Sequence, residues 1–488
     1  MRRSARRTVR AHPLAGGLDP LAAIAALRGR GPVVALESSR PSADHGGQTI
    51  VVGAPLSTFT WSRGHGRIAL LREGADELGA VAIDDAPTPF HALERWLEAA
   101  QISTDGERGG PPIGAFGYFG YELLAEPSLP RLDPFPDAFF LLADTVVHWP
   151  RPDARPTLWT ADASLAAALL PELEAHRGAA EELVAAAARS TAVAPAPESE
   201  PALLDDRARE PFAAAFRAVR SALERGDSYQ LCYTFPILRP ISRRPEDDPL
   251  ALYARLRREN PSPFGAFLEA PFGAIASSSP ERFLRVDAAG RVEARPMKGT
   301  AARPDDPRER ARLGRELVTS EKTRAENLMI ADLLRNDLGR VCRLGSVQAT
   351  RPALLEEHAT LLQLVSVIEG ELRDGGSRAD LLAAAFPPGS MTGAPKVRAI
   401  ELLRAIESGP RGPYSGALGY LAADGTMDLS VVIRSLLVSG GVARANVGGG
   451  IVWDSTVEGE FEECRLKALP LLRALRAPAS AAARRAAP

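Results

Sequence analysis

The chain has 488 residues, of which 45% are hydrophobic and 25% are charged, and its formal net charge is −2. This composition is that of a globular protein, and the balanced charge excludes a nucleic-acid binder with a basic surface and an acidic disordered chain. No run of about 18 apolar residues occurs, so the sequence predicts no membrane partner and no transmembrane helix.

The cysteines and the N-terminal residues bear on the compartment. Cys232, Cys342 and Cys464 are widely spaced and form no C-x-x-C pair. The sequence therefore predicts neither a disulfide framework nor a zinc site, and we expect a reducing, cytoplasmic location. The Arg-rich start lacks the apolar segment of a secretory signal. We interpret residues 1–14 as a disordered basic tail, with a transit peptide as the alternative.

The N-terminal region is assigned to residues 15–189. Three strands and one helix are expected in it, at 32–38, 114–119 and 139–148 for the strands and at 90–101 for the helix. An Ala-, Pro- and Glu-rich stretch follows residue 160. Its composition predicts a helix and then a flexible linker over residues 190–205.

The C-terminal region, residues 206–475, begins with an amphipathic helix that Gly226 can end. Short strands, a long helix over about 307–338 and further strands from 345 to 447 are expected after it. Because regular βαβ alternation is missing, the predicted fold class is α+β, an antiparallel β-sheet sandwich flanked by helices. Residues 476–488 are expected to form a disordered tail.

Lysine is rare in this chain. Lys298, Lys322, Lys396 and Lys467 are the only lysines among 59 basic residues, and all four follow residue 290. A desolvated lysine can act as a base or a nucleophile, whereas arginine does not readily lose its proton. The retained lysines therefore favour a functional site in the C-terminal region, and chance retention is the alternative.

Glu281 and Lys298 flank a predicted hairpin. The segment after Glu281 and the strand before Lys298 are joined by Ala-Ala-Gly, which is typical of a hairpin turn. The hairpin could bring the two side chains to the same end of a sheet. An acid and an amine placed together suit general acid and nucleophile roles, and a surface salt bridge is the alternative.

The segment G-S-M-T-G-A-P-K, residues 389–396, has features of an anion site. A Gly-rich loop precedes a helix that starts near Pro395, and free N–H groups at a helix start attract anions. Thr392 and Lys396 strengthen the prediction of a carboxylate or phosphate site. An ordinary loop–helix junction is the alternative.

Carboxylates recur on two helices. Glu460 and Glu463 share a helix face with Lys467, after the backbone N–H groups of Gly448–Gly450, and Glu326 lies four residues after Lys322. If the three carboxylates converge, their oxygens make a site for Mg²⁺. Solvated helix faces and an ordinary helix-surface ion pair are the alternatives.

These motifs and their order resemble the chorismate-binding family. That family includes anthranilate synthase component I, aminodeoxychorismate synthase component I, isochorismate synthase and salicylate synthase. The resemblance covers about residues 205–470 and rests on S-S-S-P-E-R-F, P-M-K-G-T, R-A-E-N-L-M-I-A-D-L-L-R-N-D-L-G-R, G-S-M-T-G-A-P-K and G-G-I-V-W-D-S. More weakly, Leu36, Glu37 and Ser38 resemble the tryptophan-pocket strand of the amination branch.

The resemblance implies roles for the residues. Glu281 would protonate the departing hydroxyl at carbon 4 of chorismate, and Glu326, Glu460 and Glu463 would hold Mg²⁺ at the ring carboxylate. Arg434 would reach the enolpyruvyl carboxylate. The implied substrate-binding set is Thr300, Thr392, Gly393, Lys396, Tyr420, Arg434, Gly448, Gly449 and Lys467. Such cationic and N–H groups would compensate a dianionic substrate.

Two positions select a branch of the family. Gln230 stands where the water-using relatives carry a water-activating Lys, and an amide is a poor base. Lys298 stands where anthranilate synthases carry Ala. The resemblance therefore implies amination of chorismate at carbon 4, an amino-group transfer that leads to 4-aminobenzoate and folate. Ammonia would come from a separate class I glutamine amidotransferase subunit.

One departure from the family keeps alternatives open. Relatives usually carry a His before Leu-Val-Ser, where this chain has Leu362 and Gln363. His358 lies roughly 13–17 Å away in an extended strand, too far to substitute simply. Because that His is tied to pyruvate loss, its absence argues against anthranilate or salicylate synthesis. An anthranilate synthase component I and a non-catalytic chorismate-binding paralogue remain the alternatives.

Overall fold

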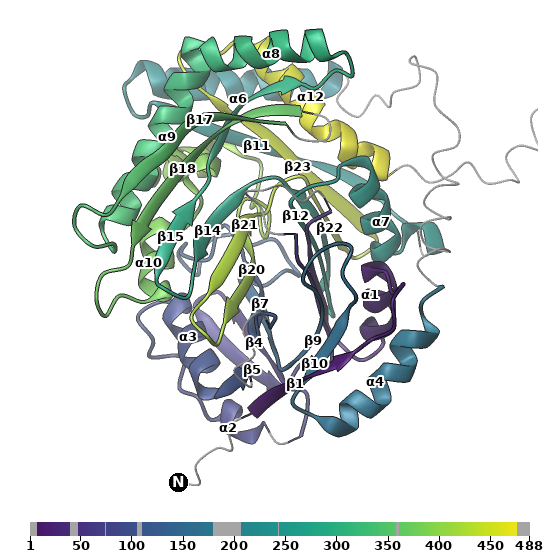
Figure 1. Ribbon diagram of the computed structural model, residues 1–488. Coiled ribbons are helices and arrows are strands. Elements are labelled where there is room, and N and C mark those ends of the chain that lie inside the picture. The colour runs from purple at the N-terminus through teal and green to yellow at the C-terminus, as the bar shows by residue number, and fades with distance from the viewer. Residues whose placement is uncertain are drawn as a thin grey trace, which may run out of the picture.

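The computed structural model describes residues 7–39, 47–73, 75–104, 110–178, 206–242, 244–357 and 361–475. Within these ranges the strands form two large sheets, one of 12 and one of 11 strands, with helices around them (Figure 1). The predicted α+β class, with antiparallel sheets flanked by helices, is confirmed. None of the helices in these ranges has the length and apolar character that crossing a bilayer requires.

The 12-stranded sheet contains strands from both halves of the chain. Its order is β19 (Gly393–Ala394), β11 (Gln230–Pro240), β23 (Val442–Ile451), β22 (Ser435–Ser439), β13 (Gly273–Ser279), β12 (Phe264–Ala270), β2 (Val33–Glu37), β3 (Thr49–Val52), β9 (Thr145–Trp149), β10 (Thr157–Thr160), β1 (Arg7–Pro13) and β6 (Ile102–Thr104). The halves join where β12 pairs antiparallel with β2. β1 and β6 are a parallel pair at one edge.

The 11-stranded sheet likewise contains strands from both halves of the chain. Its order is β16 (Met297–Ala302), β18 (Leu361–Glu371), β15 (Arg291–Ala294), β14 (Arg282–Val286), β21 (Met427–Val431), β20 (Ala417–Ala422), β7 (Gly114–Phe119), β8 (Ala138–Ala143), β4 (Ser57–Ser62) and β5 (His65–Leu70), and β17 (Gln348–Glu357) also pairs with β18. The halves join here where β20 pairs with β7. The regions predicted as 15–189 and 206–475 therefore share both sheets. The predicted linker 190–205 and tail 476–488 lie outside the described residues.

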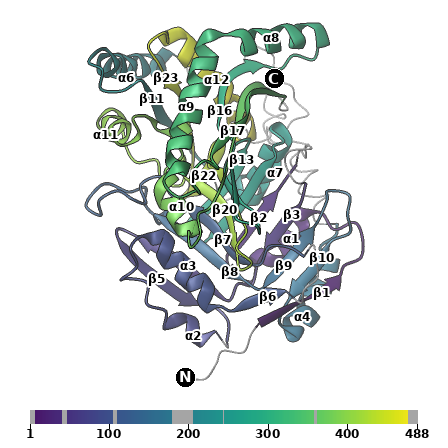
Figure 2. The ribbon, with the colours of Figure 1, turned by 60° about the vertical axis from the view of Figure 1, so that its left-hand side comes forward.

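Two buried clusters hold the layers together. One lies on the outer face of the 12-stranded sheet, under α1 (Pro20–Arg28), α4 (Ala163–Ala175), α6 (Asp206–Glu224), α7 (Pro249–Glu259), α11 (Lys396–Ile406) and α12 (Val457–Ala474). The other contains residues of both sheets and of α3 (Pro89–Ala99), α9 (Glu321–Gly339) and α10 (Arg378–Ala385) (Figure 2). Shorter or more exposed helices are α2 (Asp76–Gly79), α8 (Pro307–Thr319), η3 (Pro245–Asp247) and η4 (Gly389–Met391).

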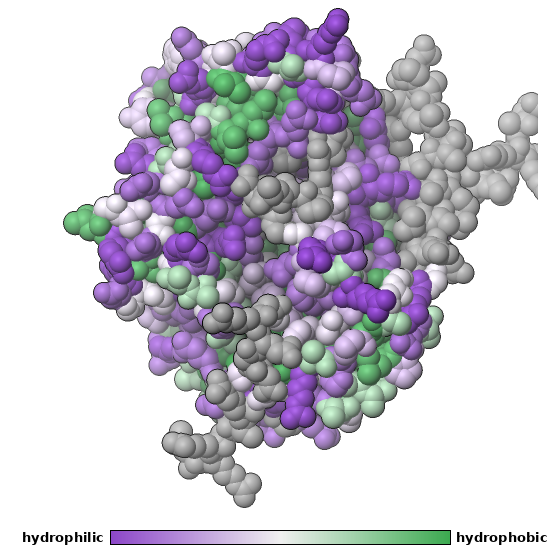
Figure 3. All heavy atoms as spheres, viewed as in Figure 1, coloured by the Kyte–Doolittle hydropathy of each residue, from purple (hydrophilic) through white to green (hydrophobic). Residues whose placement is uncertain are grey.

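The surface agrees with the charged composition. The face in Figure 3 is mainly hydrophilic, and its hydrophobic residues are scattered or lie in small groups. The large apolar side chains are instead concentrated in the two buried clusters. Burial of apolar area, at about 25 cal/mol per Å², is therefore the main stabilising contribution to the sandwich.

The prediction of a disordered tail over residues 1–14 is wrong from residue 7 onward. Arg7–Pro13 forms strand β1, which pairs with β10 on one side and with β6 on the other. Val9 is fully buried, and Leu14 is nearly so. The sequence did not indicate this strand, because Arg7 and Arg10, on either side of the buried Val9, give the segment the composition of a charged tail.

Three predicted elements are divided in the structure, each at a polar residue. The strand expected at 139–148 becomes β8 and β9, which lie in different sheets on either side of buried Asp144. The helix expected at 307–338 becomes α8 and α9, because the Ser320 hydroxyl caps α9 by accepting from the N–H of Thr323 at 3.3 Å. Among the strands expected from 345 to 447, the one at 428–438 becomes β21 and β22, which are separated around Arg434.

Candidate active site

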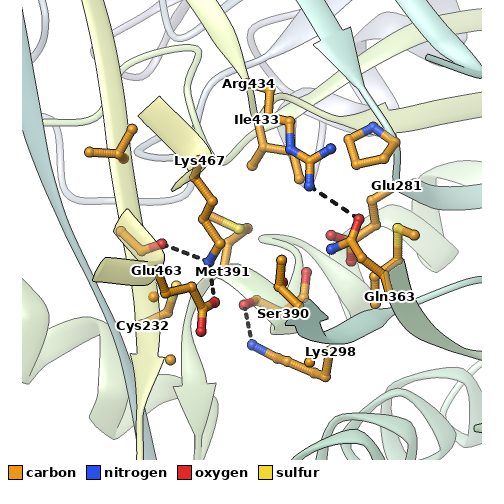
Figure 4. Close-up of a pocket in the computed structure, with 18 of the residues that line it drawn as sticks. Cys232, Glu281, Lys298, Gln363, Ser390, Met391, Ile433, Arg434, Glu463 and Lys467 are labelled. Carbon is orange, nitrogen blue, oxygen red and sulfur yellow. Dashed lines mark hydrogen bonds and ion pairs between the residues drawn. The ribbon is translucent and has the colours of Figure 1, made fainter. Parts of the chain in front are cut away.

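A cavity lies where β11, β16, β18 and β23 meet α9 and α12 (Figure 4). Figure 4 shows side chains from several of these elements pointing toward one another. Ten of the residues predicted from the sequence line it, namely Glu281, Lys298, Thr300, Glu326, Arg434, Gly448, Gly449, Glu460, Glu463 and Lys467. The structure thus brings together motifs that are separated by up to about 190 residues of chain.

The predicted hairpin places Glu281 and Lys298 at this cavity. β14 pairs with β15, Glu281 directly precedes β14, and Lys298 lies on β16, which follows β15. The Lys298 Nζ donates a hydrogen bond to the backbone oxygen of Ser390 at 3.1 Å. Glu281 is only 4% exposed, which excludes the alternative of a surface salt bridge.

The protonation of Glu281 suits an acid. Burial raises the pKa of its carboxyl to about 7, although the Ser390 hydroxyl and the charges of Lys298 and Arg434 act in the opposite direction. A carboxyl with this pKa carries its proton in a large fraction of molecules at neutral pH. A general acid works best when its pKa is near the operating pH, so Glu281 can donate a proton to a leaving group.

Arg434 reaches the cavity from the turn between β21 and β22. Its backbone is left-handed, with φ of 50°, and its Nη2 donates to the Oε1 of Gln363 at 3.1 Å. Burial lowers the pKa of the guanidinium to about 10, against the opposing charges of Glu281 and Glu463. A buried cation with one oriented donor and further N–H groups is suited to binding a carboxylate.

Gln363 and Leu362 have different environments. Gln363 lines the cavity, whereas Leu362 is fully buried in a small cluster with Leu317 and Leu364. Of the two positions at which a family His was expected, the structure therefore places Gln363 in contact with the site. His358 lies outside the described residues.

Two lysines pair with the carboxylates of one wall. The Lys322 Nζ lies 3.1 Å from the Oε1 of Glu460 and 3.8 Å from the Oε1 of Glu326. The Lys467 Nζ lies 2.7 Å from the Oε1 of Glu463 and donates to the backbone oxygen of Gly448 at 2.9 Å. With Lys298, three of the four lysines of the chain are at this site.

The carboxylates of Glu326, Glu460 and Glu463 form one wall of the cavity, the carboxylate wall. This wall has the donor chemistry of a divalent-cation site. Burial raises the pKa of Glu326 to about 7, and the nearby charges of Glu460 and Glu463 add to the effect while Lys298 and Lys322 oppose it. Carboxylate oxygens are the ligands that Mg²⁺ takes. In the described part of the chain, however, no three or more His, Cys, Asp or Glu residues stand in a ready metal-binding arrangement. The Lys322 ammonium lies between two of these carboxylates.

Gln230 lies next to Lys298 behind the glycine run. A Cβ atom on Gly450 would lie 2.8 Å from the Gln230 Nε2 and 3.2 Å from the Lys298 Nζ, so a larger residue at position 450 would displace the end of the Gln230 side chain. Gln230 is fully buried, and its amide atoms have no hydrogen-bond partner among the described residues. A buried unpaired amide favours a bound polar group at this end of the cavity.

Thr392, Gly393 and Lys396 are not among the lining residues. The Lys396 Nζ instead binds the Asp337 Oδ2 at 2.7 Å and the Ala385 carbonyl at 2.6 Å. The Thr392 hydroxyl donates to the Gly389 carbonyl at 3.1 Å, and Gly393 pairs with β11 in the sheet. These three residues therefore make their contacts within the protein, and their predicted role in substrate binding stays a prediction.

Tyr420 belongs to a second cavity. It lines that cavity together with Leu36, Glu37 and Ser38, the residues predicted as a tryptophan pocket. Strand alternation explains this placement, since β20 turns the Tyr420 side chain toward β12 and β2. The predicted role of Tyr420 in substrate binding stays a prediction. The Tyr253 hydroxyl donates to the Glu37 Oε2 at 3.1 Å, which fixes one wall.

The sequence did not identify Ser390, Tyr414 or Asn446 as lining residues of the first cavity. Ser390 lies in the same Gly-rich loop as Thr392. The sequence identified this loop as a candidate site, but it did not show that Ser390 is the residue that faces the cavity. The turn η4 decides that Ser390 and Met391 face the cavity while Thr392 faces the protein. Tyr414 and Asn446 carry no such signal.

Comparison with known proteins agrees with this geometry. The family model described as chorismate binding enzyme matches residues 57–473. Aminodeoxychorismate synthase of Streptomyces griseus is 38% identical over 90% of this chain and 60% of its own length. Aminodeoxychorismate synthase component 1 of Bacillus subtilis (strain 168) is 32% identical over 91% of each chain. The chain spans about half the length of several curated relatives, between 28% and 60%.

A solved structure is similar over most of the chain. Anthranilate synthase component I from Streptococcus pneumoniae TIGR4 matches with a TM-score of 0.64 and 26% identity, over 88% of this chain and 93% of that one. The fold, the convergent cavity and the family model agree, and the chain belongs to the chorismate-binding enzyme family.

Proposed function

We propose that this chain aminates chorismate at carbon 4 and forms 4-amino-4-deoxychorismate, as component I of an aminodeoxychorismate synthase. The observation that carries the proposal is Lys298, an amine in the cavity beside the buried acid Glu281. The names of the Streptomyces and Bacillus relatives support the same activity.

The proposed reaction uses the two side chains in turn. The Lys298 amine attacks carbon 2, the ring double bond shifts, and the carbon 4 hydroxyl leaves as water with the proton of Glu281. Ammonia then adds at carbon 4, the double bond shifts back, and Lys298 leaves carbon 2 as an amine. The proton that the incoming nitrogen loses restores Glu281. The sum is chorismate and ammonia giving aminodeoxychorismate and water, a covalent catalysis by an amine.

The charge of the cavity fits a dianionic substrate. Arg434 and Lys467 are cationic, and the glycines 448–450 leave room for a close approach of the substrate to the backbone. We assign Arg434, oriented by Gln363, to one substrate carboxylate. A Mg²⁺ ion held by Glu326, Glu460 and Glu463 would supply charge compensation for the ring carboxylate. Binding of the ion would displace Lys322 from its present contacts.

Ammonia would come from a separate glutaminase subunit of the class I amidotransferase type. The name component 1 of the Bacillus relative supports a two-component enzyme. Its product would serve 4-aminobenzoate and folate synthesis. Gln230 supports ammonia rather than water as the nucleophile, because its neutral amide cannot activate water by taking a proton.

The second cavity is proposed to bind tryptophan. Its lining includes Leu36, Glu37 and Ser38 together with the aromatic rings of Phe264 and Tyr420. L-tryptophan should then raise the thermal midpoint of the wild-type protein, and Ser38→Phe, which fills the cavity, should abolish the shift. An equal shift in both proteins would place any tryptophan site elsewhere.

Product identity tests the main proposal. The protein is incubated with chorismate, Mg²⁺ and an ammonium salt, and the products are identified by mass spectrometry. We expect aminodeoxychorismate from the wild type and none from Lys298→Ala or Lys298→Arg, since the second variant keeps the charge without a usable nucleophile.

Anthranilate synthesis is the second candidate, favoured by the likeness to the Streptococcus structure. Lys298 argues against it. Anthranilate as the product would establish this candidate, and no product from folded protein would favour a non-catalytic paralogue. Full aminodeoxychorismate formation by Lys298→Ala would remove the proposed role of the lysine.

A further inference from the structure

Arg411 is a fully buried arginine that lies behind the first cavity and does not line it. All five of its N–H donors are used. The Nε donates to the Glu407 Oε2 at 2.9 Å, and the Nη1 donates to the Met391 carbonyl at 2.6 Å and the Ser415 hydroxyl at 3.1 Å. The Nη2 donates to the Cys232 carbonyl at 2.7 Å and the Glu407 Oε1 at 2.6 Å.

Two of the residues that accept from Arg411 belong to the wall of the cavity, and a third is next to it in the chain. Cys232 and Met391 line it, and Ser415 directly follows Tyr414, which lines it as well. These residues come from β11, from η4 and from the segment before β20. One planar guanidinium therefore fixes three segments that are distant in the sequence, which the single point charge of a lysine cannot do.

Arg411 and Lys298 bind adjacent residues of the η4 turn. The Lys298 Nζ binds the carbonyl of Ser390 at 3.1 Å, and Arg411 binds the next carbonyl, that of Met391. A shift of the η4 turn would move the acceptor of the Lys298 amine. Arg411 is therefore placed to influence the position of the amine without contact to any substrate.

The N-terminal region completes this arrangement. The Arg411 guanidinium lies 4.3 Å from the centre of the Tyr121 ring. The half-buried Glu122 carboxylate accepts from the backbone N–H groups of Arg411 and Gly412, at 2.8 and 2.9 Å. The Tyr121 N–H in turn donates to the Gly412 carbonyl at 2.8 Å. Residues from the first third of the chain thus hold the loop that carries Arg411.

We propose that Arg411 is a positioning residue of the active site and that Tyr121 and Glu122 support it. It holds Cys232 and Met391 of the cavity wall, and with them the Lys298 amine, in the geometry that the reaction needs. The effect on catalysis rests on the proposed function, whereas the effect on the cavity wall does not. The N-terminal region is accordingly a part of the catalytic unit.

Arg411→Lys tests the proposal, with Arg378→Lys as the matched control. Arg378 is also buried and binds the carbonyls of Ala422 and Thr426 and the Glu94 carboxylate, but none of these acceptors lines the cavity. We expect kcat to fall about 10- to 100-fold in Arg411→Lys, as for a small misplacement of a reacting group, with the KM for chorismate nearly unchanged. Arg378→Lys should keep wild-type kcat.

The rate of cysteine alkylation distinguishes a local effect on the cavity wall from a general loss of stability, which would not change Cys232 selectively. The protein has three cysteines, all buried, and only Cys232 lines the cavity. Peptide mass spectrometry after exposure to a maleimide should show faster alkylation of Cys232 in Arg411→Lys, with Cys342 and Cys464 at their wild-type rates. Glu122→Gln should show the same selective change to a smaller extent, and it replaces Arg411→Lys if that variant does not fold.

Two results would overturn the proposal. One is an unchanged kcat in a folded variant with wild-type Cys232 reactivity. The other is an equal rise in the alkylation of all three cysteines, which would indicate general loosening. If the wild type makes no aminodeoxychorismate, the proposed function fails, and the Cys232 rates still decide whether Arg411 holds the wall.

Discussion

Replacement of Glu281 by glutamine should make the stability of the protein less dependent on pH. Burial raises the pKa of this carboxyl from 4.5 to about 7 in the folded state. The protonated carboxyl is therefore favoured by folding, and its contribution to stability is present at low pH. That contribution is lost as the pH rises from the unfolded value of 4.5 through the folded value. Glutamine is neutral throughout and shows no such loss.

The size of the effect follows from the shift in pKa. One unit corresponds to about 1.4 kcal/mol, so between pH 5 and pH 8 the wild type should lose about 2–3 kcal/mol of unfolding free energy through this group. Glu326 has a similar shift in the same direction. Because Glu326 is present in both proteins, its contribution cancels when the variant is compared with the wild type.

Urea unfolding of both proteins at pH 5 and pH 8 measures this quantity. The free energy of unfolding of Glu281→Gln, relative to the wild type, should be higher at pH 8 than at pH 5 by the amount given above. Glu462→Gln is the matched control, because this carboxylate is exposed on α12, and it should keep the wild-type pH dependence. The same pH dependence in wild type and Glu281→Gln would refute the account of a buried, largely protonated acid.

Three further predictions concern the same cavity. First, kcat/KM should fall as the pH rises above about 7, by about tenfold per unit once Glu281 is deprotonated, and a profile that stays flat to pH 9 would contradict its role as acid. Second, Gln363→Leu should raise the KM for chorismate about tenfold, because Arg434 loses its oriented partner, and steady-state kinetics with an unchanged KM would argue against this contact. Third, Mg²⁺ should raise the thermal midpoint of the wild type but not of Glu463→Gln, and equal shifts in both would exclude the carboxylate wall as the ion site.

The parts of the site that the sequence predicted are those fixed by local geometry. The hairpin of β14 and β15 places Glu281 and Lys298 at one end of a sheet, as its turn residues indicated. The spacing of Glu460, Glu463 and Lys467 on α12 likewise puts these three side chains in one cavity. In both cases a short segment determines which residues share a face.

The parts that the sequence did not predict depend on long-range packing. Lys396 has the residues of an anion site around it, yet Asp337 of α9 takes its ammonium group. Tyr420 faces the second cavity because β20 lies between β7 and β21, a neighbour relation that its own sequence does not contain. Arg411 carried no signal in the sequence, since its contacts with the cavity wall go to the carbonyls of Cys232 and Met391, which are distant in the chain.

The rarity of lysine proved informative in a way that single motifs were not. Lys298, Lys322 and Lys467 meet at one site, and only Lys396 lies apart. A chain that otherwise relies on arginine has thus kept amines where carboxylates and a substrate cavity converge. The structural clustering argues against chance retention, and it leaves the covalent role of Lys298 as the step to be tested.

A covalent adduct on Lys298 would test the central claim most directly. The wild type is mixed with chorismate and Mg²⁺ without ammonia, quenched in denaturant, digested, and mapped by peptide mass spectrometry. The proposed mechanism predicts an added mass of chorismate less one water on the peptide that contains Lys298, and a decrease of that peptide when ammonium is added before the quench. An unmodified Lys298 peptide, together with full aminodeoxychorismate formation by Lys298→Ala, would contradict the claim.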